Sequence, residues 1–286
     1  IASKNLVVQQ MKKLRFNFKI NLINKKKIVF NLLTNKELNI INVDYKFKKV
    51  FDKISESSNL YIKNSFDIAL TLLKTNKFIG LINGPISKKT FLKNKFFGMT
   101  EFFANKTEVK KNKFAMLIYN KRLSVSPLTT HIALKEVHKS ITNNKIIDLV
   151  LLINEFYKKR LKKKPKIAIT GLNPHCESNY KTSEEERIIK PAIKYLRRKK
   201  INSFGPFPAD TIFLKEVSKK YDVVVGMYHD QVLTPLKTLF GFDAINITLG
   251  LPFIRISPDH GPNEKMIGKN RSNPQSLVQA IKFLDK

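Results

Sequence analysis

Short apolar runs rich in β-branched residues alternate along this chain with longer amphipathic segments, a pattern that is typical of α/β proteins. The runs that predict strands are Lys27–Leu33, Phe78–Asn83, Phe114–Tyr119, Leu123–Ser126, Lys166–Thr170, Asp222–Met227 and Ala244–Thr248. The segments that predict helices are Leu60–Leu73, Leu134–Ser140, Ile146–Leu161, Ser183–Lys199, Thr211–Lys220 and Gln275–Leu284. The fourth helix opens with a capping-box spacing, Ser183 to Glu186, which satisfies exposed backbone N–H groups. We therefore expect a sheet covered by helices.

The size and composition of the chain are those of a globular protein. Its 286 residues, of which 42% are hydrophobic, can bury a sizeable core. Apolar runs such as Ile146–Ile153 are much too short to span a bilayer, and no secretory leader opens the chain. A single cysteine excludes an internal disulfide framework, so we expect a cytoplasmic location. Because the first residue is Ile1 rather than methionine, we also expect that the chain has lost its start.

The net charge of +32 suggests nucleic-acid binding at first sight. The lysines, however, are spread over nearly every segment and form no recognisable binding motif with aromatic residues. Basic runs such as Lys158–Lys164 and Arg197–Lys200 come at the ends of predicted helices, where cations favour the negative end of the helix dipole. We expect a solvated surface that helps to attract an anionic substrate and binds nucleic acid weakly, without sequence preference.

Three of the five histidines follow predicted strands. His131, His175 and His229 each come shortly after such a strand ends. Ligands of open α/β sheets bind beyond the carboxyl ends of strands, and neutral imidazole is a good ligand for Zn²⁺ and related divalent metals. The pattern predicts a metal site, with ordinary loop histidines as the alternative. His138 is expected on the surface, and Cys176, beside His175, is expected to be structural rather than catalytic.

A second group of polar residues lies near predicted strand ends and turns: Asp210, Asp230, Lys237, Asn246 and Arg255. Lysine and arginine can bind a phosphate or carboxylate, and the carboxylates can orient histidines or bind a substrate hydroxyl. Each could equally be a partner in a salt bridge.

Several strings that contain these residues resemble one family. The strings are Asn83–Lys88 (NGPISK), Gly98–Phe103 (GMTEFF), Thr129–His131 (TTH), Gly171–His175 (GLNPH), Gly205–Thr211 (GPFPADT), Met227–Gln231 (MYHDQ) and Asn246–Arg255 (NITLGLPFIR). In this order and spacing, from about Phe78 to the end of the chain, they resemble the 4-hydroxythreonine-4-phosphate dehydrogenase family of pyridoxal phosphate biosynthesis.

This resemblance implies an α/β/α architecture with two lobes around a cleft, similar to isocitrate and isopropylmalate dehydrogenases. The expected lobes are residues 1–98 with 250–286, and residues 99–249 with the metal ligands and dimer contacts. The resemblance also implies a homodimer with shared active sites. The implied reaction is NAD(P)-dependent oxidation of 4-phosphooxy-L-threonine to 2-amino-3-oxo-4-phosphooxybutanoate, which loses CO₂ to give 3-amino-2-oxopropyl phosphate.

The resemblance assigns roles by motif position. It makes His131, His175 and His229 ligands of one divalent metal (Zn, Mg, Co or Mn), with His229 supplied by the other subunit. Thr100, Lys237, Asn246 and Arg255, with the neighbouring Met99, match substrate-binding positions. Asp210 and Asp230 match supporting acids, and we count them with Lys237 as catalytic candidates.

The last segment resembles the cofactor loop of the isopropylmalate dehydrogenases. His260, Gly261, Gly268 and Asn273, in residues 260–274, have the matching spacing. The ten glycines show neither a G-x-G-x-x-G nor a Walker spacing, so NAD or NADP must be bound without the usual Rossmann signature. The alternative is a surface loop rich in proline and glycine.

The sequence also departs from the family pattern. Met99 stands where the family usually has histidine, which removes a hydrogen-bond donor expected to face the substrate phosphate. The family's N-terminal strand and its Gly/Pro-rich loop are not found. Two alternatives therefore stay open: a related dehydrogenase acting on phosphothreonate or phosphoerythronate, and a basic nucleic-acid-binding or inactive relative.

Overall fold

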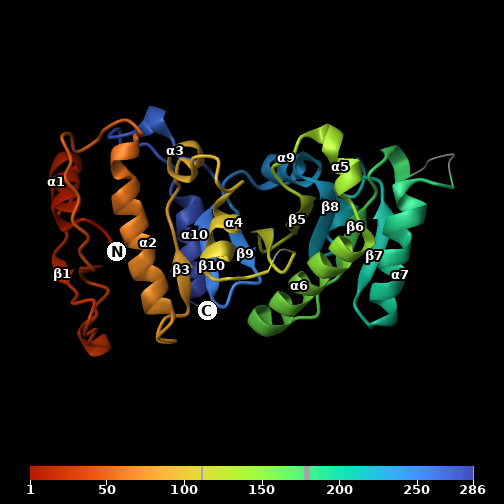
Figure 1. Ribbon diagram of the computed structural model, residues 1–286, viewed down its shortest axis with the longest axis horizontal. Coiled ribbons are helices and arrows are strands. Elements are labelled where there is room, and N and C mark those ends of the chain that lie inside the picture. Colours follow the sequence, from red (N-terminus) through yellow and green to blue (C-terminus); the bar gives the residue numbers. More distant parts are fainter. Residues whose placement is uncertain (111, 177–180, 286) are drawn as a thin grey trace. The chain divides into compact units, whose positions relative to one another are not determined.

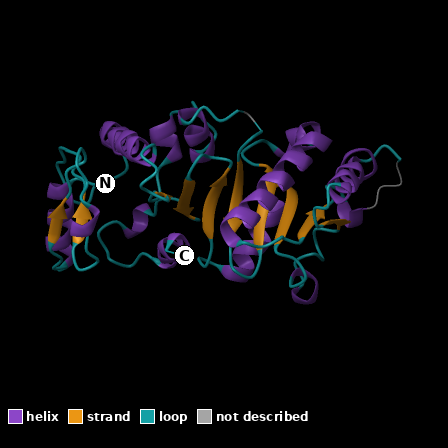
Figure 2. Ribbon diagram, turned by 90° about the horizontal axis from the view of Figure 1, so that it is seen from below, coloured by secondary structure: helices purple, strands orange, loops and turns teal. Residues whose placement is uncertain are grey.

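The computed structural model describes residues 1–110, 112–176 and 181–285, which form two compact units. The smaller unit consists of residues 1–81, 85–94 and 261–273, and the larger of residues 82–84, 95–260 and 274–286. The expected α/β class is confirmed, because a large sheet in the larger unit has helices on both faces (Figures 1 and 2). No described helix is long and apolar enough to cross a membrane.

The large sheet has eight strands in the order β3-β10-β9-β4-β5-β8-β6-β7, and all of them except β3 lie entirely in the larger unit. These strands are β3 (Gly80–Ile82), β4 (Ala115–Tyr119), β5 (Ser124–Thr129), β6 (Ile167–Thr170), β7 (Ser203–Phe207), β8 (Val223–Tyr228), β9 (Ile245–Leu249) and β10 (Ile254–Pro258). From β10 to β5 the neighbours pair antiparallel, whereas β5, β8, β6 and β7 pair parallel. The four parallel strands therefore end at one common edge.

The helical segments of the larger unit connect these strands. They are α4 (Met99–Lys106), α5 (Leu134–Ser140), α6 (Asn143–Leu161), η3 (Pro174–Cys176), the π-helix η4 (Glu185–Ile189), α7 (Lys190–Arg198), α8 (Lys215–Ser218), α9 (His229–Phe240) and α10 (Gln275–Leu284).

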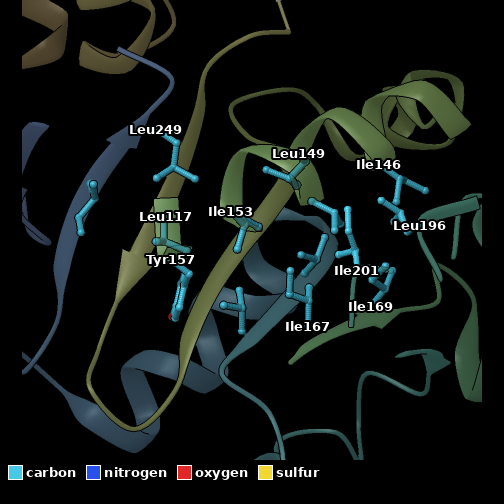
Figure 3. Packing of buried hydrophobic residues seen from close by; sticks show 14 of the residues in the cluster. Leu117, Ile146, Leu149, Ile153, Tyr157, Ile167, Ile169, Leu196, Ile201 and Leu249 are labelled. Carbon is cyan, nitrogen blue, oxygen red and sulfur yellow. The ribbon is translucent and has the colours of Figure 1, made fainter. Parts of the chain in front are cut away.

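One face of the sheet packs against α6, α7 and α10. Ile146, Leu149 and Ile153 of α6 point at strand residues such as Ile167 and Ile169 (Figure 3). Burying one such side chain contributes about 1.5–3 kcal/mol. Because successive strand residues point to opposite faces, Ala168 lies on the other face, in a second core cluster to which α9 contributes. Both faces of the parallel strands are thus buried, which explains their continuous apolar sequences.

The smaller unit contains short elements. They are α1 (Lys4–Leu14), β1 (Ile20–Leu22), η1 (Phe30–Leu32), β2 (Leu38–Ile40), η2 (Glu56–Ser58), α2 (Asn59–Leu73), α3 (Lys88–Leu92) and η5 (Glu264–Met266). The strands β1 and β2 pair parallel. Ser3 caps α1 through its hydroxyl, which accepts a hydrogen bond from the Leu6 N–H.

Most of the predicted elements are confirmed, with three corrections. The strand expected at Lys27–Leu33 is wrong, because the structure has the short 3₁₀ helix η1 there. The helix expected at Ser183–Lys199 is divided into η4 and α7, since Pro191 has no N–H to continue an α-helical ladder. Of the helix expected at Thr211–Lys220, only α8 forms, after a series of turns.

Candidate active site

The candidate site begins at the common edge of the four parallel strands. These strands lie side by side in the order β5, β8, β6, β7 (Figure 1). His131 follows β5, His229 follows β8 directly, His175 follows β6, and Asp210 follows β7. The sequence pattern of strand, loop and histidine therefore corresponds to one edge of one sheet.

His131 and His229 are neighbours within the chain. Their ring centroids are 5.8 Å apart, and the ring planes are inclined by 41°. Two imidazoles that share one Zn²⁺, with Zn–N distances of about 2 Å, have centroids about 5–6 Å apart. The pair is therefore spaced as two ligands of one ion would be.

His175 does not lie in a complete set of metal ligands within the described part of this chain. The described residues contain no group of three or more His, Cys, Asp or Glu side chains that could hold a metal ion. His175 has a left-handed backbone (φ 55°), and its Nδ1 lies 3.7 Å from Oδ2 of Asp210. Within one chain, two of the three predicted ligands, His131 and His229, therefore lie close together.

The two predicted supporting acids lie beside predicted ligands. Asp230 Oδ1 is 2.7 Å from Nδ1 of His229, and Asp210 accompanies His175. In the tautomer whose Nδ1 donates to this carboxylate, Nε2 has the lone pair that a metal needs. The arrangement of Asp230 and His229 suits an oriented metal ligand.

The loop that leads to His175 is held by a buried carboxylate. Oε1 of Glu185 accepts hydrogen bonds from the backbone N–H groups of Leu172 and Asn173, each at 2.8 Å. Its Oε2 accepts a further bond, at 2.9 Å, from the side-chain amide of Asn173. Burial raises the pKa of Glu185, but the hydrogen bonds from Asn173, backbone and side chain, outweigh it, and the pKa is lowered.

A second polar group lies on β9 and β10. Thr248 and Arg255 are opposite each other in the antiparallel pair, so their side chains share a face. Nη1 of Arg255 donates to the Thr248 hydroxyl at 3.2 Å, and the hydroxyls of Thr248 and Thr100 are 3.4 Å apart. Asn246 lies two residues before Thr248, on the same face. The structure therefore brings three predicted substrate-binding residues together: Thr100, Asn246 and Arg255.

Arg255 is far more buried than a surface anion-binding residue. Only 2% of it is exposed, its Nε donates to Oδ1 of Asn83 at 2.8 Å, and its guanidinium lies 5.2 Å from the Phe103 ring centroid. Burial lowers the pKa of Arg255 to about 10, against the opposing effect of the Glu101 carboxylate. The guanidinium therefore still carries its charge at neutral pH.

Two buried acceptors near this group have no hydrogen-bond partner. Among the described residues, Oε2 of Glu101 and Oδ1 of Asn246 are buried without a donor. Glu101 and His131 both lie against Gly98, because a Cβ placed there would be 3.0 Å from Oε2 of Glu101 and 3.4 Å from Cε1 of His131. Unpaired buried acceptors cost free energy, so a ligand with N–H or O–H donors would be stabilised here.

Lys237, near the end of α9, forms hydrogen bonds with another residue of the protein, Asp259. Its ammonium group donates to the backbone oxygen and to Oδ2 of Asp259, both at 2.8 Å. Burial raises the pKa of Asp259, although Lys237 acts in the opposite direction. Lys237 thus forms an ion pair with Asp259.

The predicted cofactor residues are divided between the two units. His260 belongs to the larger unit, where its ring centroid is 6.0 Å from that of Phe242. Gly261, Gly268 and Asn273 belong to the smaller unit. Gly268 has a positive φ of 71°, and a Cβ there would approach the Phe51 ring to 3.2 Å.

Two expectations about other residues agree with the structure. His138 is exposed on α5. Burial raises the pKa of Cys176, which disfavours the reactive thiolate.

No sequence pattern indicated a site role for Glu185, Gln231, Asp259, Glu101 or Asn83. Gln231 and Asn83 occur within the strings that resemble the family, and Glu185 within the capping box. Their positions in the sequence were therefore visible, but their partners in space were not.

Fold and site together define an α/β enzyme whose strand-edge histidines lie in the same unit as the buried polar cluster around Arg255. Its chain belongs to the family described as “Pyridoxal phosphate biosynthetic protein PdxA”, which matches residues 1–284.

Individual relatives agree with this family. The chain is 41% identical to a 4-hydroxythreonine-4-phosphate dehydrogenase of Sulfurihydrogenibium sp., over 86% of this chain and 75% of the relative. It is 38% identical to a D-threonate 4-phosphate dehydrogenase of Salmonella typhimurium, over 65% of this chain and 57% of the relative. The crystal structure of 4-hydroxythreonine-4-phosphate dehydrogenase from Klebsiella pneumoniae superposes with a TM-score of 0.83, at 26% identity, over 99% of this chain and 88% of that one.

The buried carboxylate of Glu185 gives a prediction for stability. Glu185→Gln turns one accepting oxygen into an N–H donor facing Asn173, and we expect it to destabilise the fold by about 1–3 kcal/mol at pH 7. The pKa of Glu185 is lower in the folded than in the unfolded state, so its contribution is complete above the unfolded pKa. That contribution is lost as pH falls through the folded pKa. The difference between wild type and Glu185→Gln should therefore shrink below about pH 4.5.

Denaturant unfolding at pH 7 and pH 3.5 measures this difference. The matched control is Glu186→Gln, one residue further on, where the carboxylate is exposed and paired with Lys190 on the surface. Equal stabilities of the two variants at pH 7 would contradict a structural role of Glu185.

Proposed function

We propose that this protein is an NAD(P)-dependent dehydrogenase that oxidises 4-phosphooxy-L-threonine to 2-amino-3-oxo-4-phosphooxybutanoate. The product decarboxylates to 3-amino-2-oxopropyl phosphate, a step of pyridoxal 5′-phosphate (vitamin B6) biosynthesis. Membership of the family and the names of its relatives support this reaction. The observation that carries the proposal is the common strand edge, where three adjacent strands are each followed by a histidine.

One divalent metal per site, Zn, Mg, Co or Mn, is part of the proposal, with His131, His175 and His229 as ligands. The donor chemistry fits, because imidazole suits these metals. The third ligand position is completed between two chains of a homodimer, with His229 supplied by the partner subunit, as the family resemblance implies. When bound, the metal would lower the pKa of the substrate hydroxyl and stabilise the developing alkoxide.

The protein's own residues bind and orient the substrate. The first N–H groups of α4 lack a side-chain cap, and a helix N-terminus favours a phosphate. Thr100 and Arg255 lie in the same cluster as Asn246, and the unpaired acceptor of Asn246 suits a hydroxyl or ammonium donor. Lys237 supplies a further cation for phosphate or carboxylate. Asp210 and Asp230 act by orienting His175 and His229.

The cofactor, NAD or NADP, is assigned to the loop with His260, Gly261, Gly268 and Asn273. Gly268 in this loop has a left-handed backbone, which glycine adopts readily, and this is consistent with a tight loop that binds a ligand closely. The lobes remain those proposed from the sequence, residues 1–98 with 250–286 and residues 99–249. We place the enzyme in the cytoplasm, with no specific nucleic-acid or membrane partner.

A second substrate class is favoured by two observations. A relative from Salmonella typhimurium is named D-threonate 4-phosphate dehydrogenase, and Met99 replaces the usual histidine at the proposed phosphate position. The alternative substrates are phosphothreonate and phosphoerythronate, which carry a hydroxyl in place of the amino group.

A coupled assay decides between the substrates. The full-length protein is given each phosphorylated four-carbon acid with NAD⁺ or NADP⁺, with and without chelator, and the formation of reduced cofactor is followed. We expect turnover with 4-phosphooxy-L-threonine that is lost with chelator and restored by added metal. Turnover of the threonate or erythronate alone would transfer the assignment to the second class, and no turnover of any acid would overturn both.

Met99→His tests the phosphate position. A thioether cannot donate a hydrogen bond, whereas histidine can, and a charge-assisted bond contributes about 1.5–3 kcal/mol. We expect KM for 4-phosphooxy-L-threonine to fall by up to about tenfold to a hundredfold with little change in kcat.

Met99 is only 7% exposed, so its side chain could instead serve to pack the core. An unchanged KM together with a lower melting temperature would mean that the residue serves the core. A switch of preference from another acid toward 4-phosphooxy-L-threonine would show that Met99 marks a different natural substrate.

A further inference from the structure

Gln231, in the first turn of α9, is buried, and its side-chain amide makes hydrogen bonds through both its oxygen and its nitrogen. Its Oε1 accepts from the backbone N–H of Met227 at 2.7 Å and from the Thr170 hydroxyl at 2.9 Å. Its Nε2 donates to the backbone oxygen of Gly171 at 2.9 Å. One side chain thus binds the end of β8, the end of β6 and the loop that follows β6.

These bonds continue the sheet beyond its last paired residues. The described pairing of β6 with β8 ends at Ile169 and Val225. The partners of Gln231 lie one or two residues further along both strands, so its amide acts where the backbone pairing stops. On the other side of β8, the Thr129 hydroxyl donates to the backbone oxygen of Met227 at 2.8 Å. The end of β8 is therefore fixed from both neighbouring strands.

The space for this amide is tightly defined. A Cβ placed on Gly226 would lie 2.4 Å from Cγ1 of Val232 and 3.1 Å from Oε1 of Gln231, so a residue without a side chain stands where α9 and the amide pass the strand. A buried amide that loses its partners costs about 1–3 kcal/mol, which favours one position of the two strand ends over others.

The segments that carry two of the proposed metal ligands begin at the residues that Gln231 binds. His229 is two residues before it on α9, and the loop from Gly171 carries His175 four residues later. The ends of two adjacent parallel strands can shift relative to each other. A shift of about 1 Å there would change the positions of both histidine side chains. The Gln231 amide is the described side-chain link between these two segments.

We propose that Gln231 is a positioning residue for the metal ligands. It fixes the His175 loop and the start of α9 that carries His229, so that each histidine is set for the shared site it serves, and it does not bind the metal itself. This inference rests on the proposed function, because it requires that these histidines bind the metal. Residues that orient ligands typically change metal affinity by about 10–100-fold when they are replaced.

The test measures Co²⁺ binding by its visible absorption, in the purified protein without substrate. Gln231→Leu removes all three hydrogen bonds, and we expect about 10–100-fold weaker binding and an altered spectrum. Gln231→Glu is the milder variant, since it keeps both accepting bonds and loses only the donation to Gly171. We expect it to weaken Co²⁺ binding less than Gln231→Leu does.

Tyr157→Phe is the matched control for stability. The Tyr157 hydroxyl is also buried, and it donates to the Ser124 hydroxyl at 2.9 Å, at the opposite end of the parallel strands. This variant should lose a comparable part of the stability while it keeps wild-type Co²⁺ affinity and spectrum.

The outcomes separate the two proposals. If both Gln231 variants are destabilised but bind Co²⁺ as the wild type does, Gln231 has only a structural role and the inference is overturned. If His175→Ala binds Co²⁺ as tightly as the wild type, or the wild type binds none, the proposed metal centre itself is wrong, and the inference with it.

Discussion

Replacing His175 with alanine should remove both the bound metal and the turnover. Metal-ion catalysis supplies several kcal/mol of transition-state stabilisation, and each 1.4 kcal/mol corresponds to a factor of ten in rate. We therefore expect kcat/KM to fall by about 10³-fold or more. Elemental analysis of the purified variant and the coupled assay measure the two losses independently. The exposed position of the His175 side chain limits the accompanying loss of stability.

The matched control is His138→Ala, which removes another exposed imidazole in the same unit, on α5. It should keep the metal content and the rate of the wild type. Two results would contradict the prediction: a His175→Ala protein that retains stoichiometric metal, or full activity of wild type in a sample that elemental analysis finds metal-free.

The interior strands could be predicted because their continuous apolar sequences indicate that both of their faces are buried. Strands β6 and β8 are continuous apolar runs, as expected when both faces of a sheet are buried, and both were found from that pattern. The histidine positions followed from the same reasoning, because parallel strands end at a common edge. Periodicity and topology together were sufficient for this part of the site.

Two elements that contain proline or glycine, α9 and β7, were not predicted. The helix α9 has Pro235 inside it, and β7 contains Gly205 and Pro206, residues that normally indicate a break. Tertiary packing overrides these local preferences: Leu233 and Leu236 of α9 are buried in the second core cluster. The packing energy that decides such cases comes from residues far away in the sequence.

The side chains that support the site were not predictable for a related reason. Gln231 binds Gly171, 60 positions away, and Arg255 binds Asn83, 172 positions away. A sequence pattern identifies Arg255 as a candidate for anion binding but carries no sign of its burial over Phe103. Such partners depend on which strands become neighbours.

Mixing inactive variants should restore activity if the active site is shared between two chains. The three single variants His131→Ala, His175→Ala and His229→Ala are mixed in pairs and allowed to exchange subunits. With His229 supplied by the partner subunit, His229→Ala should complement either of the other two. Random exchange gives half heterodimers with one intact site each, so activity should return to about a quarter of the wild-type value. Native mass spectrometry confirms that heterodimers form.

The third mixture, His131→Ala with His175→Ala, distinguishes the possible arrangements. It should stay inactive under the proposed arrangement, because both of these ligands then come from the same chain. The structure provides a specific rival, since His131 and His229 of one chain have ring centroids 5.8 Å apart. If these two act together and His175 comes from the partner subunit, the third mixture recovers and the mixture of His131→Ala with His229→Ala does not. If no mixture recovers although heterodimers are present, each chain builds its own site, and the common edge of β5, β8 and β6 must bring all three ligands together within one chain.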